Sequence, residues 1–283
     1  MFKEVSVIGG DLRIIKLIES LSNDGIKVYT YGFNNMFKDK NNIVEFATID
    51  KCLEKSNYII SAIPLSKDGI YLNAPYVEEK IELKEIVHKF SNKTFVAGVI
   101  NKEIIEILEK QNNVIIDLMK NEVLTIYNAI STVEGVIAKM IMNTDITIYK
   151  SNILILGYGR IGKILANRLS NFGANIFCEA RKEKDIAWIN TGGYIPVELD
   201  KLEEFIKQNK LDIIINTIPY LILDKKILKL LNKDVYILDL ASKPGGIDFN
   251  YAQKLNLNVE WYLGVPGKIS PVSAAEFIKD VLM

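Results

Sequence analysis

The residues whose types and spacing most clearly indicate a ligand-binding site form a glycine-rich turn near the middle of the chain. The turn consists of Gly157, Tyr158, Gly159, Arg160, Ile161 and Gly162. In this spacing the first glycine permits a tight bend, the second lets the backbone approach a pyrophosphate, and the third allows close helix–strand packing. An apolar run at Asn152–Leu156 precedes the turn and a helical pattern at Ile161–Asn171 follows it. We therefore predict a dinucleotide site at the start of a helix, the alternative being a glycine turn without a ligand.

The end of the next strand bears on the identity of the dinucleotide. An acid at this place binds the ribose hydroxyls of NAD, whereas an arginine accommodates the additional phosphate of NADP. The sequence offers both, because Glu179 is followed by Ala180, Arg181 and Lys182. Two cations facing one phosphate favour NADP, and Glu179 leaves NAD open.

Two further loops follow predicted strands of the same half. Ligands in parallel α/β sheets bind beyond the carboxyl ends of the strands, so both loops are expected at the cofactor site. We predict cofactor contacts from Thr217, Ile218, Pro219 and Ala241. The second loop, Asp239–Gly246, contains one cation, Lys243, which we predict to bind a substrate carboxylate. The alternative for this loop is a plain turn without a ligand.

The first half offers candidates for binding the substrate. A turn containing Gly9 and Gly10 lacks the third glycine of a dinucleotide loop, which favours a substrate loop. An arginine clamps a carboxylate through two parallel hydrogen bonds. The predicted substrate residues, each with a helix cap or surface polar group as the alternative, are Asp11, Arg13, Asn101, Asn128, Ser131, Thr132, Glu134 and Lys243.

No catalytic residue or metal ligand set can be assigned. His88 is the only histidine of the sequence and lies in a charged run, Glu78–Phe90, with a helical pattern. A solvated helix face explains it better than a proton relay.

The elements that must position these residues follow from hydropathy. Short runs rich in Val and Ile alternate with stretches of helical period, which is typical of βαβ units and a parallel sheet. The predicted strands are Val5–Ile8, Lys27–Tyr31, Ile43–Phe46, Tyr58–Ala62, Thr94–Val96, Val114–Ile116, Asn152–Leu156, Asn175–Cys178, Tyr194–Pro196, Asp212–Ile215, Val235–Asp239 and Asn258–Trp261.

The two halves repeat one plan, since each opens with a strand, a glycine turn and a helix, and each reaches a strand that ends in Ile-Pro. The fold class is therefore α/β, with two Rossmann-like doubly wound parallel-sheet domains joined by a bridging helix. We expect an N-terminal substrate domain at 1–128, a bridging helix and linker at 129–149, and an NADP-binding domain at 150–271. Ser131 or Thr132 would cap the bridging helix. A C-terminal helix at 272–283 would return to the first domain, leaving a cleft for the substrate.

Composition excludes several classes of protein. The 35 basic and 35 acidic residues cancel, so no overall field favours nucleic acid or an anionic membrane. Two cysteines far apart in the sequence favour neither a disulfide framework nor a zinc site. The start shows no signal peptide and no apolar run is long enough for a membrane span, so we expect a cytoplasmic protein. The sequence leaves a homo-oligomer open.

The chain resembles the dipicolinate synthase A subunits of endospore-forming bacteria over nearly its whole length. The segments that carry the resemblance are 7–11 with Arg13, 126–128, 132–135, 157–162, 216–219, 238–242, 244–246, Gly264 and 266–267.

The resemblance implies oxidation of dihydrodipicolinate, or its hydrated precursor from the lysine pathway, to dipicolinate (pyridine-2,6-dicarboxylate), with NADP as hydride acceptor. It also implies that the partner is a flavoprotein-like B subunit, and that the protein acts during sporulation in the mother cell. A diacid needs cations, which Arg13 and Lys243 could supply, and formation of an aromatic ring needs little acid–base assistance. Glu179 stands where a small residue is expected in relatives, which keeps NAD open. Two alternatives are another two-domain dehydrogenase of small amino or hydroxy acids and a protein that senses the nucleotide without turnover.

Overall fold

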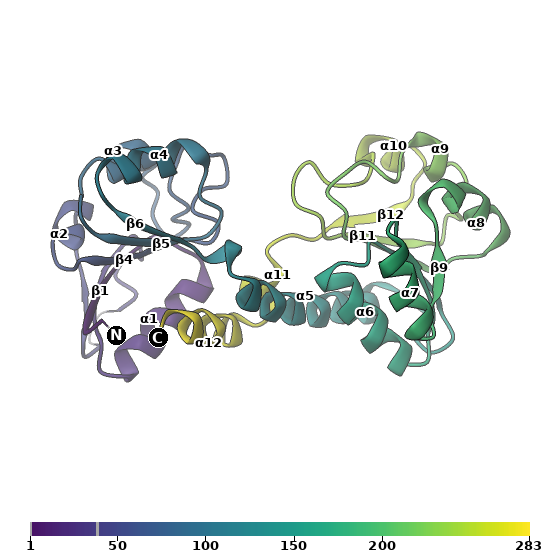
Figure 1. The fold of residues 1–283 in the computed structure, drawn as a ribbon, viewed down its shortest axis with the longest axis horizontal. Helices are drawn as coiled ribbons and strands as arrows, with labels where there is room; N and C mark the ends of the chain where they lie inside the picture. The colour runs from purple at the N-terminus through teal and green to yellow at the C-terminus, as the bar shows by residue number, and fades with distance from the viewer. Residues whose placement is uncertain (1, 38–39) are drawn as a thin grey trace. The chain divides into compact units, whose positions relative to one another are not determined.

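The protein has two compact units built on the same plan. The computed structural model describes residues 2–37 and 40–283. Unit 1 comprises residues 1–128 and 266–283, and unit 2 comprises residues 129–265 (Figure 1). Helix α5 (Glu122–Asn143) begins in unit 1 and ends in unit 2.

Unit 1 contains a six-stranded parallel sheet in the order β3-β2-β1-β4-β5-β6. Its strands are β1 (Glu4–Ile8), β2 (Lys27–Tyr31), β3 (Ile43–Glu45), β4 (Tyr58–Ser61), β5 (Thr94–Ala97) and β6 (Val114–Asp117). Its helices are α1 (Leu12–Asn23), α2 (Ile49–Leu53), α3 (Leu83–Val87), α4 (Lys102–Lys110), a 3-10 turn at Leu118–Lys120, α11 (Val265–Ile269), which begins at the last residue of unit 2, and α12 (Pro271–Leu282).

Unit 2 repeats this arrangement, with the sheet order β12-β11-β10-β7-β8-β9 and all strands parallel. Its strands are β7 (Asn152–Leu156), β8 (Asn175–Glu179), β9 (Ile195–Val197), β10 (Ile213–Asn216), β11 (Tyr236–Asp239) and β12 (Asn258–Trp261). Its helices are α6 (Arg160–Asn171), α7 (Glu183–Thr191), a 3-10 turn at Leu199–Lys201, α8 (Leu202–Gln208), α9 (Lys225–Leu228) and α10 (Phe249–Lys254).

The predicted fold class is confirmed. In both units the first strand lies beside the fourth, which is the strand order of a doubly wound Rossmann sheet. The ends of all twelve predicted strands agree with the observed ends to within one residue. Central strands are buried on both faces, which is why they read as unbroken apolar runs.

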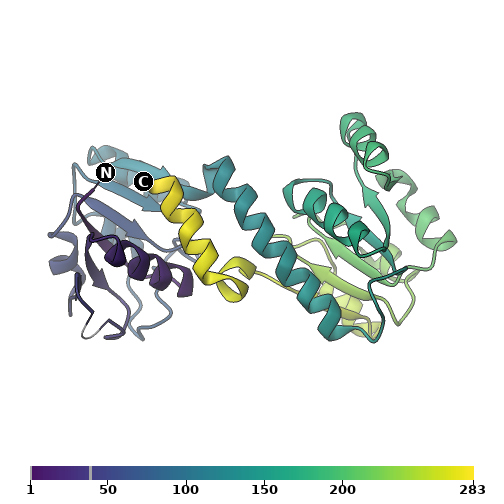
Figure 2. The ribbon, with the colours of Figure 1, turned by 90° about the horizontal axis from the view of Figure 1, so that it is seen from below.

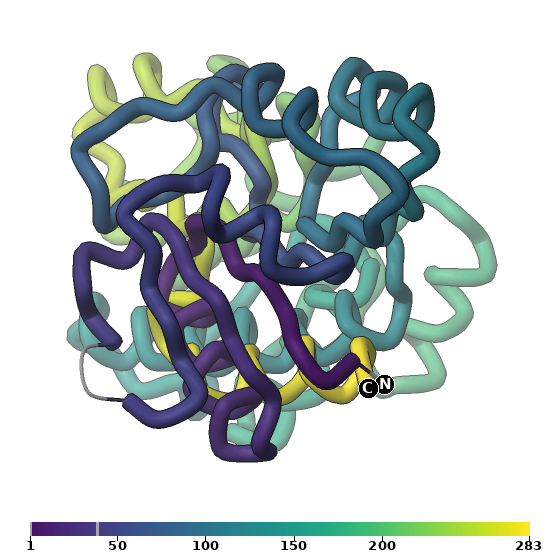
Figure 3. The backbone as a smooth tube through the Cα atoms, turned by 90° about the vertical axis from the view of Figure 1, so that its left-hand side faces the viewer, coloured from purple at the N-terminus to yellow at the C-terminus, as the bar shows by residue number. Residues whose placement is uncertain are grey.

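The C-terminal helix belongs to the core of unit 1. Helix α12 packs along α1, as Figure 2 shows in yellow and purple. Ile278 is buried there, Ser20 Oγ donates to Glu276 at 2.6 Å, and Lys279 pairs with Asp24 at 3.0 Å. The two ends of the chain therefore share one core, and Figure 3 shows them side by side.

Two expectations about helices are wrong. The bridging helix begins at Glu122, so Ser131 and Thr132 lie within α5 and are not its N-cap. Asn121 supplies the cap instead, because its Oδ1 accepts from the amide of Leu124 at 3.0 Å. The run at 78–90 forms a helix only at Leu83–Val87, since the amide of Leu72 donates to the carbonyl of Ile81 and holds the preceding residues in a paired loop.

Candidate functional site

The glycine turn of unit 2 lies between β7 and β10, where the order in which strands are added to the sheet reverses. Strands β7 and β10 are neighbours, and the turn joins the carboxyl end of β7 to α6. Gly159 is the N-cap of α6, and no side chain caps this end. The first turn of the helix contains no acidic residue. Helix amides and the helix dipole both favour an anion at such an end.

The space around the three glycines fits a pyrophosphate. A Cβ on Gly157 would lie 2.5 Å from Thr217 Oγ1, and one on Gly162 would lie 2.0 Å from the Gly157 carbonyl oxygen. These two glycines are therefore required by the packing of the turn itself. A Cβ on Gly159 would meet nothing within 4 Å, so the side of the turn on which a phosphate would approach is open.

Glu179 is the last residue of β8 and is only 1% exposed. Burial raises the pKa of its carboxyl group, although a hydrogen bond from the Gly157 backbone and the charge of Arg181 act to lower it. Its Oε1 atom is buried without a hydrogen-bond partner among the described residues. Ala180 is buried, whereas Arg181 and Lys182 are exposed.

The other cofactor candidates also lie at the carboxyl ends of the unit 2 strands. Thr217 and Ile218 are half-buried and Pro219 is exposed; Thr217 Oγ1 donates to the carbonyl of Leu156 at 2.9 Å. Ala241 is buried and Lys243 is exposed in the loop after β11. Strand order thus brings the cofactor candidates of unit 2 to one edge, with Lys243 beside them.

Sequence reasoning missed two residues that organise this edge. Asn216 and Asp239 end neighbouring strands, are fully buried, and are joined by a hydrogen bond of 2.8 Å from Asn216 Nδ2 to Asp239 Oδ1. Both stood in the predicted loops as polar residues that directly follow an apolar run, which is the signal that could have identified them.

Asp11 and Arg13 form a close ion pair in unit 1. Arg13 is 6% exposed and its Nη2 atom lies 2.7 Å from Asp11 Oδ2 and 2.5 Å from the carbonyl oxygen of Ile63. Arg13 Nε also donates to Asp11 Oδ1 at 3.0 Å. One edge of the guanidinium is therefore occupied by Asp11, and within residues 2–37 and 40–283 Nη1 is the only one of its nitrogens without a hydrogen bond. A Cβ on Gly267 would lie 2.8 Å from Asp11 Oδ2, so this glycine makes room for the pair.

Asn101 also lies at the carboxyl end of the unit 1 sheet. It is the N-cap of α4, where its Oδ1 accepts from the Ile104 amide at 2.9 Å. Its Nδ2 donates to the carbonyl of Gly69 at 3.2 Å. Asn101 therefore caps a helix, which is the role that the sequence analysis left open as the alternative to a substrate contact.

The four candidates on α5 differ in environment. Asn128, Ser131 and Thr132 are buried, and their spacing places them on one side of the helix. Glu134 is exposed and its Oε1 lies 3.8 Å from Arg168 Nη1, a loose ion pair on the surface of unit 2.

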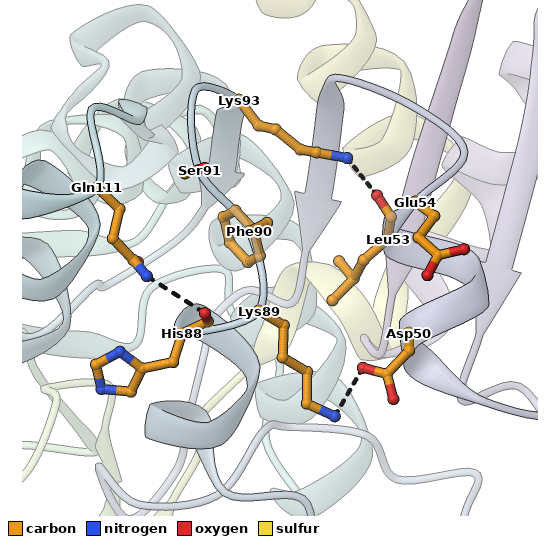
Figure 4. Close-up of a pocket in the computed structure, with 9 residues that line it drawn as sticks. All are labelled: Asp50, Leu53, Glu54, His88, Lys89, Phe90, Ser91, Lys93 and Gln111. Atoms are coloured by element: carbon orange, nitrogen blue, oxygen red, sulfur yellow. Dashed lines mark hydrogen bonds and ion pairs between the residues drawn. The ribbon is translucent and has the colours of Figure 1, made fainter.

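A cavity of about 610 Å³ opens at the amino ends of the unit 1 strands, near the start of β5 (Figure 4). His88 is exposed there, at the end of α3. Lys93 Nζ donates to the carbonyls of Leu53 and Ser56, and Lys89 pairs with Asp50 at 2.7 Å. The polar groups that line this cavity therefore form hydrogen bonds and ion pairs between loops. The cavity lies at the amino ends of the strands, whereas parallel α/β sheets bind their ligands beyond the carboxyl ends.

Within residues 2–37 and 40–283, no three potential metal ligands lie close enough to hold an ion. No helix in those residues is long and apolar enough to cross a membrane. Cys52 and Cys178 are buried, and burial raises the pKa of each thiol to about 12. Neither thiol is therefore suited to act as a nucleophile.

Two family models match overlapping parts of the chain. Residues 4–119 match the N-terminal domain of the dipicolinate synthase A subunit. Residues 103–242 match the NAD binding domain of the D-isomer specific 2-hydroxyacid dehydrogenases. The second match covers the glycine turn and most of the two following loops, so unit 2 contains a nicotinamide-nucleotide-binding domain of a dehydrogenase family.

The chain is similar to proteins of one kind along its full length. It is 31% identical to the dipicolinate synthase A subunit of Bacillus subtilis (strain 168) over 281 residues, which is 99% of this chain and 94% of that protein. Crystal structures of the dipicolinate synthase A subunit from Bacillus halodurans and Bacillus subtilis each superpose with a TM-score of 0.87 at 30% identity, covering 99% and 100% of this chain and 96% and 95% of theirs. A transhydrogenase from Sinorhizobium meliloti shares the fold at 13% identity with a TM-score of 0.68, covering 98% of this chain and 93% of that one. The chain belongs to the family of dipicolinate synthase A subunits.

Proposed function

We propose that the protein oxidises dihydrodipicolinate, or its hydrated precursor, to dipicolinate with NADP as the hydride acceptor. The observation that carries the proposal is the open glycine turn at the start of α6 in a chain of this family. When bound there, a nicotinamide nucleotide would supply the redox chemistry by taking up a hydride. The protein's part is then to bind and orient two anionic molecules.

The cofactor would be held mainly by backbone groups. Amides at the start of α6 would bind the pyrophosphate, and the absence of an acid in the first turn removes a competing charge. Thr217 and Ala241 would line the site at the ends of β10 and β11. Loss of a hydride to the nicotinamide and of a proton to water converts the dihydropyridine into an aromatic ring, and the hydrated precursor must also release one molecule of water. We assign no side chain as the proton acceptor, because formation of the aromatic ring favours this step.

NADP remains the preferred acceptor on the strength of Arg181 and Lys182, both exposed beyond β8. Glu179 opposes this preference when it is charged, since a carboxylate repels a 2′-phosphate. Burial raises the pKa of Glu179 and so favours its neutral form, which weakens the objection.

The carboxylates of the substrate require cations, and each unit offers one candidate. In unit 2 the candidate is Lys243, which is exposed at the carboxyl end of the sheet. In unit 1 the candidate is Arg13, through Nη1, with Asp11 fixing the guanidinium plane. Asn101, Asn128, Ser131, Thr132 and Glu134 stay candidates for lesser contacts.

The proposed reaction also assigns the protein to spore formation in the cytoplasm of a mother cell, where its partner would be the flavoprotein-like B subunit.

The test of the proposed function is a spectrophotometric assay of nucleotide reduction with enzymatically prepared dihydrodipicolinate, with and without the B subunit. We expect turnover with NADP. Nucleotide binding without turnover under both conditions would favour a sensor, and turnover of simple 2-hydroxy or 2-amino acids would favour an ordinary dehydrogenase.

A further inference from the structure

A buried carboxylate at the edge of the unit 2 sheet is held by hydrogen-bond donors alone. Asp239 is the last residue of β11 and is 0% exposed. Its Oδ1 accepts from Asn216 Nδ2 at 2.8 Å and from the Ala241 amide at 3.0 Å, and its Oδ2 accepts from the Gly246 amide at 2.8 Å. No ion pair involving Asp239 is found in the described residues. A buried charge of this kind persists only where several donors compensate for the loss of water.

Asn216 extends the same network to the next strand. It ends β10 directly opposite Asp239 in the parallel pairing. Its Oδ1 accepts from the Ile218 amide at 3.1 Å, and its Nδ2 donates to the Ile218 carbonyl at 3.0 Å. The two side chains therefore connect the turn after β10 with the loop after β11, and these are two of the segments assigned to the cofactor.

The loop after β11 is fitted closely against this pair. A Cβ on Gly246 would lie 2.2 Å from Asn216 Nδ2, and one on Gly245, whose φ is +84°, would lie 3.0 Å from Asp239 Oδ2. On the far side, Trp261 Nε1 donates to the Ala241 carbonyl at 2.8 Å. The loop that carries Lys243 is thus held by hydrogen bonds at Ala241 and at Gly246, on either side of the lysine.

We infer that Asp239 is a positioning residue for the nucleotide site, an inference that rests on the proposed function. Two acceptor oxygens are needed because three donors converge on this side chain, and an amide offers only one oxygen as an acceptor. Through these bonds it fixes the turn at Thr217 and the loop at Ala241 before the nucleotide arrives. Preorganisation of this kind lowers the cost of ordering the loops on binding.

Asp239→Asn tests the inference, because it keeps the size of the side chain and replaces one acceptor oxygen with a donor. At least one of the three hydrogen bonds must then be lost, whichever way the amide is turned. We expect the Kd of NADP and NADPH, measured by isothermal titration calorimetry, to rise about 10- to 100-fold, the range for a buried donor left unsatisfied.

Asp212→Asn is the matched control. Asp212 lies just before β10, at the opposite edge of the sheet, and its Oδ2 accepts from the Asn152 amide at 2.8 Å. The amide oxygen of this variant can keep its single hydrogen bond, so we expect its nucleotide Kd to stay within about twofold of the wild type. A general effect of exchanging a carboxylate for an amide at a strand end is thereby separated from a loss of positioning.

Asn216→Ala provides a second route if the first variant does not fold. It leaves both backbone bonds of Asp239 in place and cuts only the link to the turn after β10. We expect a raised nucleotide Kd here as well. A wild-type Kd in either folded variant, or an equal rise in Asp212→Asn, would overturn the inference. If the wild-type chain binds no nucleotide at all, it is the proposed function that fails.

Discussion

Gly159→Ala separates the binding of a nucleotide from the stability of the fold. Gly159 has a φ of −82°, which any residue can adopt, and a Cβ at this position would meet nothing within 4 Å. The protein therefore has room for the methyl group. The cost to the fold is that of replacing a glycine N-cap by alanine, about 0.5–1 kcal/mol.

The same methyl group would occupy the open side of the turn, where a pyrophosphate must approach the backbone. Displacing one phosphate oxygen from an amide loses a charge-assisted hydrogen bond, which contributes about 1.5–3 kcal/mol. Each 1.36 kcal/mol corresponds to a factor of ten, so the Kd of NADP should rise by about 10- to 100-fold. Calorimetric titration gives the Kd, and thermal unfolding followed by circular dichroism gives the stability.

Gly162→Ala is the contrasting variant. Its Cβ would lie 2.0 Å from the backbone oxygen of Gly157, so helix and turn must move apart and stability must fall together with binding. If Gly159→Ala bound NADP as tightly as the wild type does, the pyrophosphate could not lie against this turn and the reasoning would be refuted.

Three further predictions concern other parts of the molecule. Glu179→Gln should strengthen binding of NADP relative to NAD by roughly tenfold at pH values above the raised pKa of Glu179, where its carboxylate is charged. Because the pKa of Glu179 is raised by burial, its contribution to stability is full below the ordinary glutamate pKa and is lost as pH rises through the raised value; the glutamine variant should lack this loss in unfolding experiments across pH. Lys243→Ala should raise the KM for dihydrodipicolinate about tenfold and leave the Kd of NADP nearly unchanged, whereas unchanged kinetics would remove it from the site. Ile278→Ala, in the buried face of α12, should lower the free energy of unfolding of unit 1 by about 2–5 kcal/mol in chemical denaturation, and a smaller loss would show that α12 contributes little to that core.

The strands could be predicted from the sequence because a strand that is buried on both faces consists of consecutive apolar residues. Ile213, Ile214 and Ile215 of β10 are all buried, and such a run admits few alternatives between two turns. The glycine turn was equally readable, since Gly157 and Gly162 are fixed by contacts that exclude any side chain. Helix starts were harder to predict. At the start of α5, Asn121 accepts hydrogen bonds from the amides of Leu124 and Thr125, and a serine or threonine further along the sequence matched the same capping pattern.

The partners of individual polar residues could not be read from the sequence. The sequence predicts that Arg13 clamps a substrate carboxylate through two hydrogen bonds, whereas in the structure Asp11 occupies one edge of its guanidinium. Asp239 and Asn216 are 23 residues apart and meet only because β10 and β11 pair in register. Such contacts depend on sheet register and loop conformation, which local sequence patterns do not specify.

A crystal structure of the protein with NADP bound would test the central claim most directly. We predict pyrophosphate oxygens within about 2.7–3.2 Å of backbone amides at the start of α6, beside Gly159. A nucleotide bound elsewhere, such as at the Gly9–Arg13 turn of unit 1, would contradict the account.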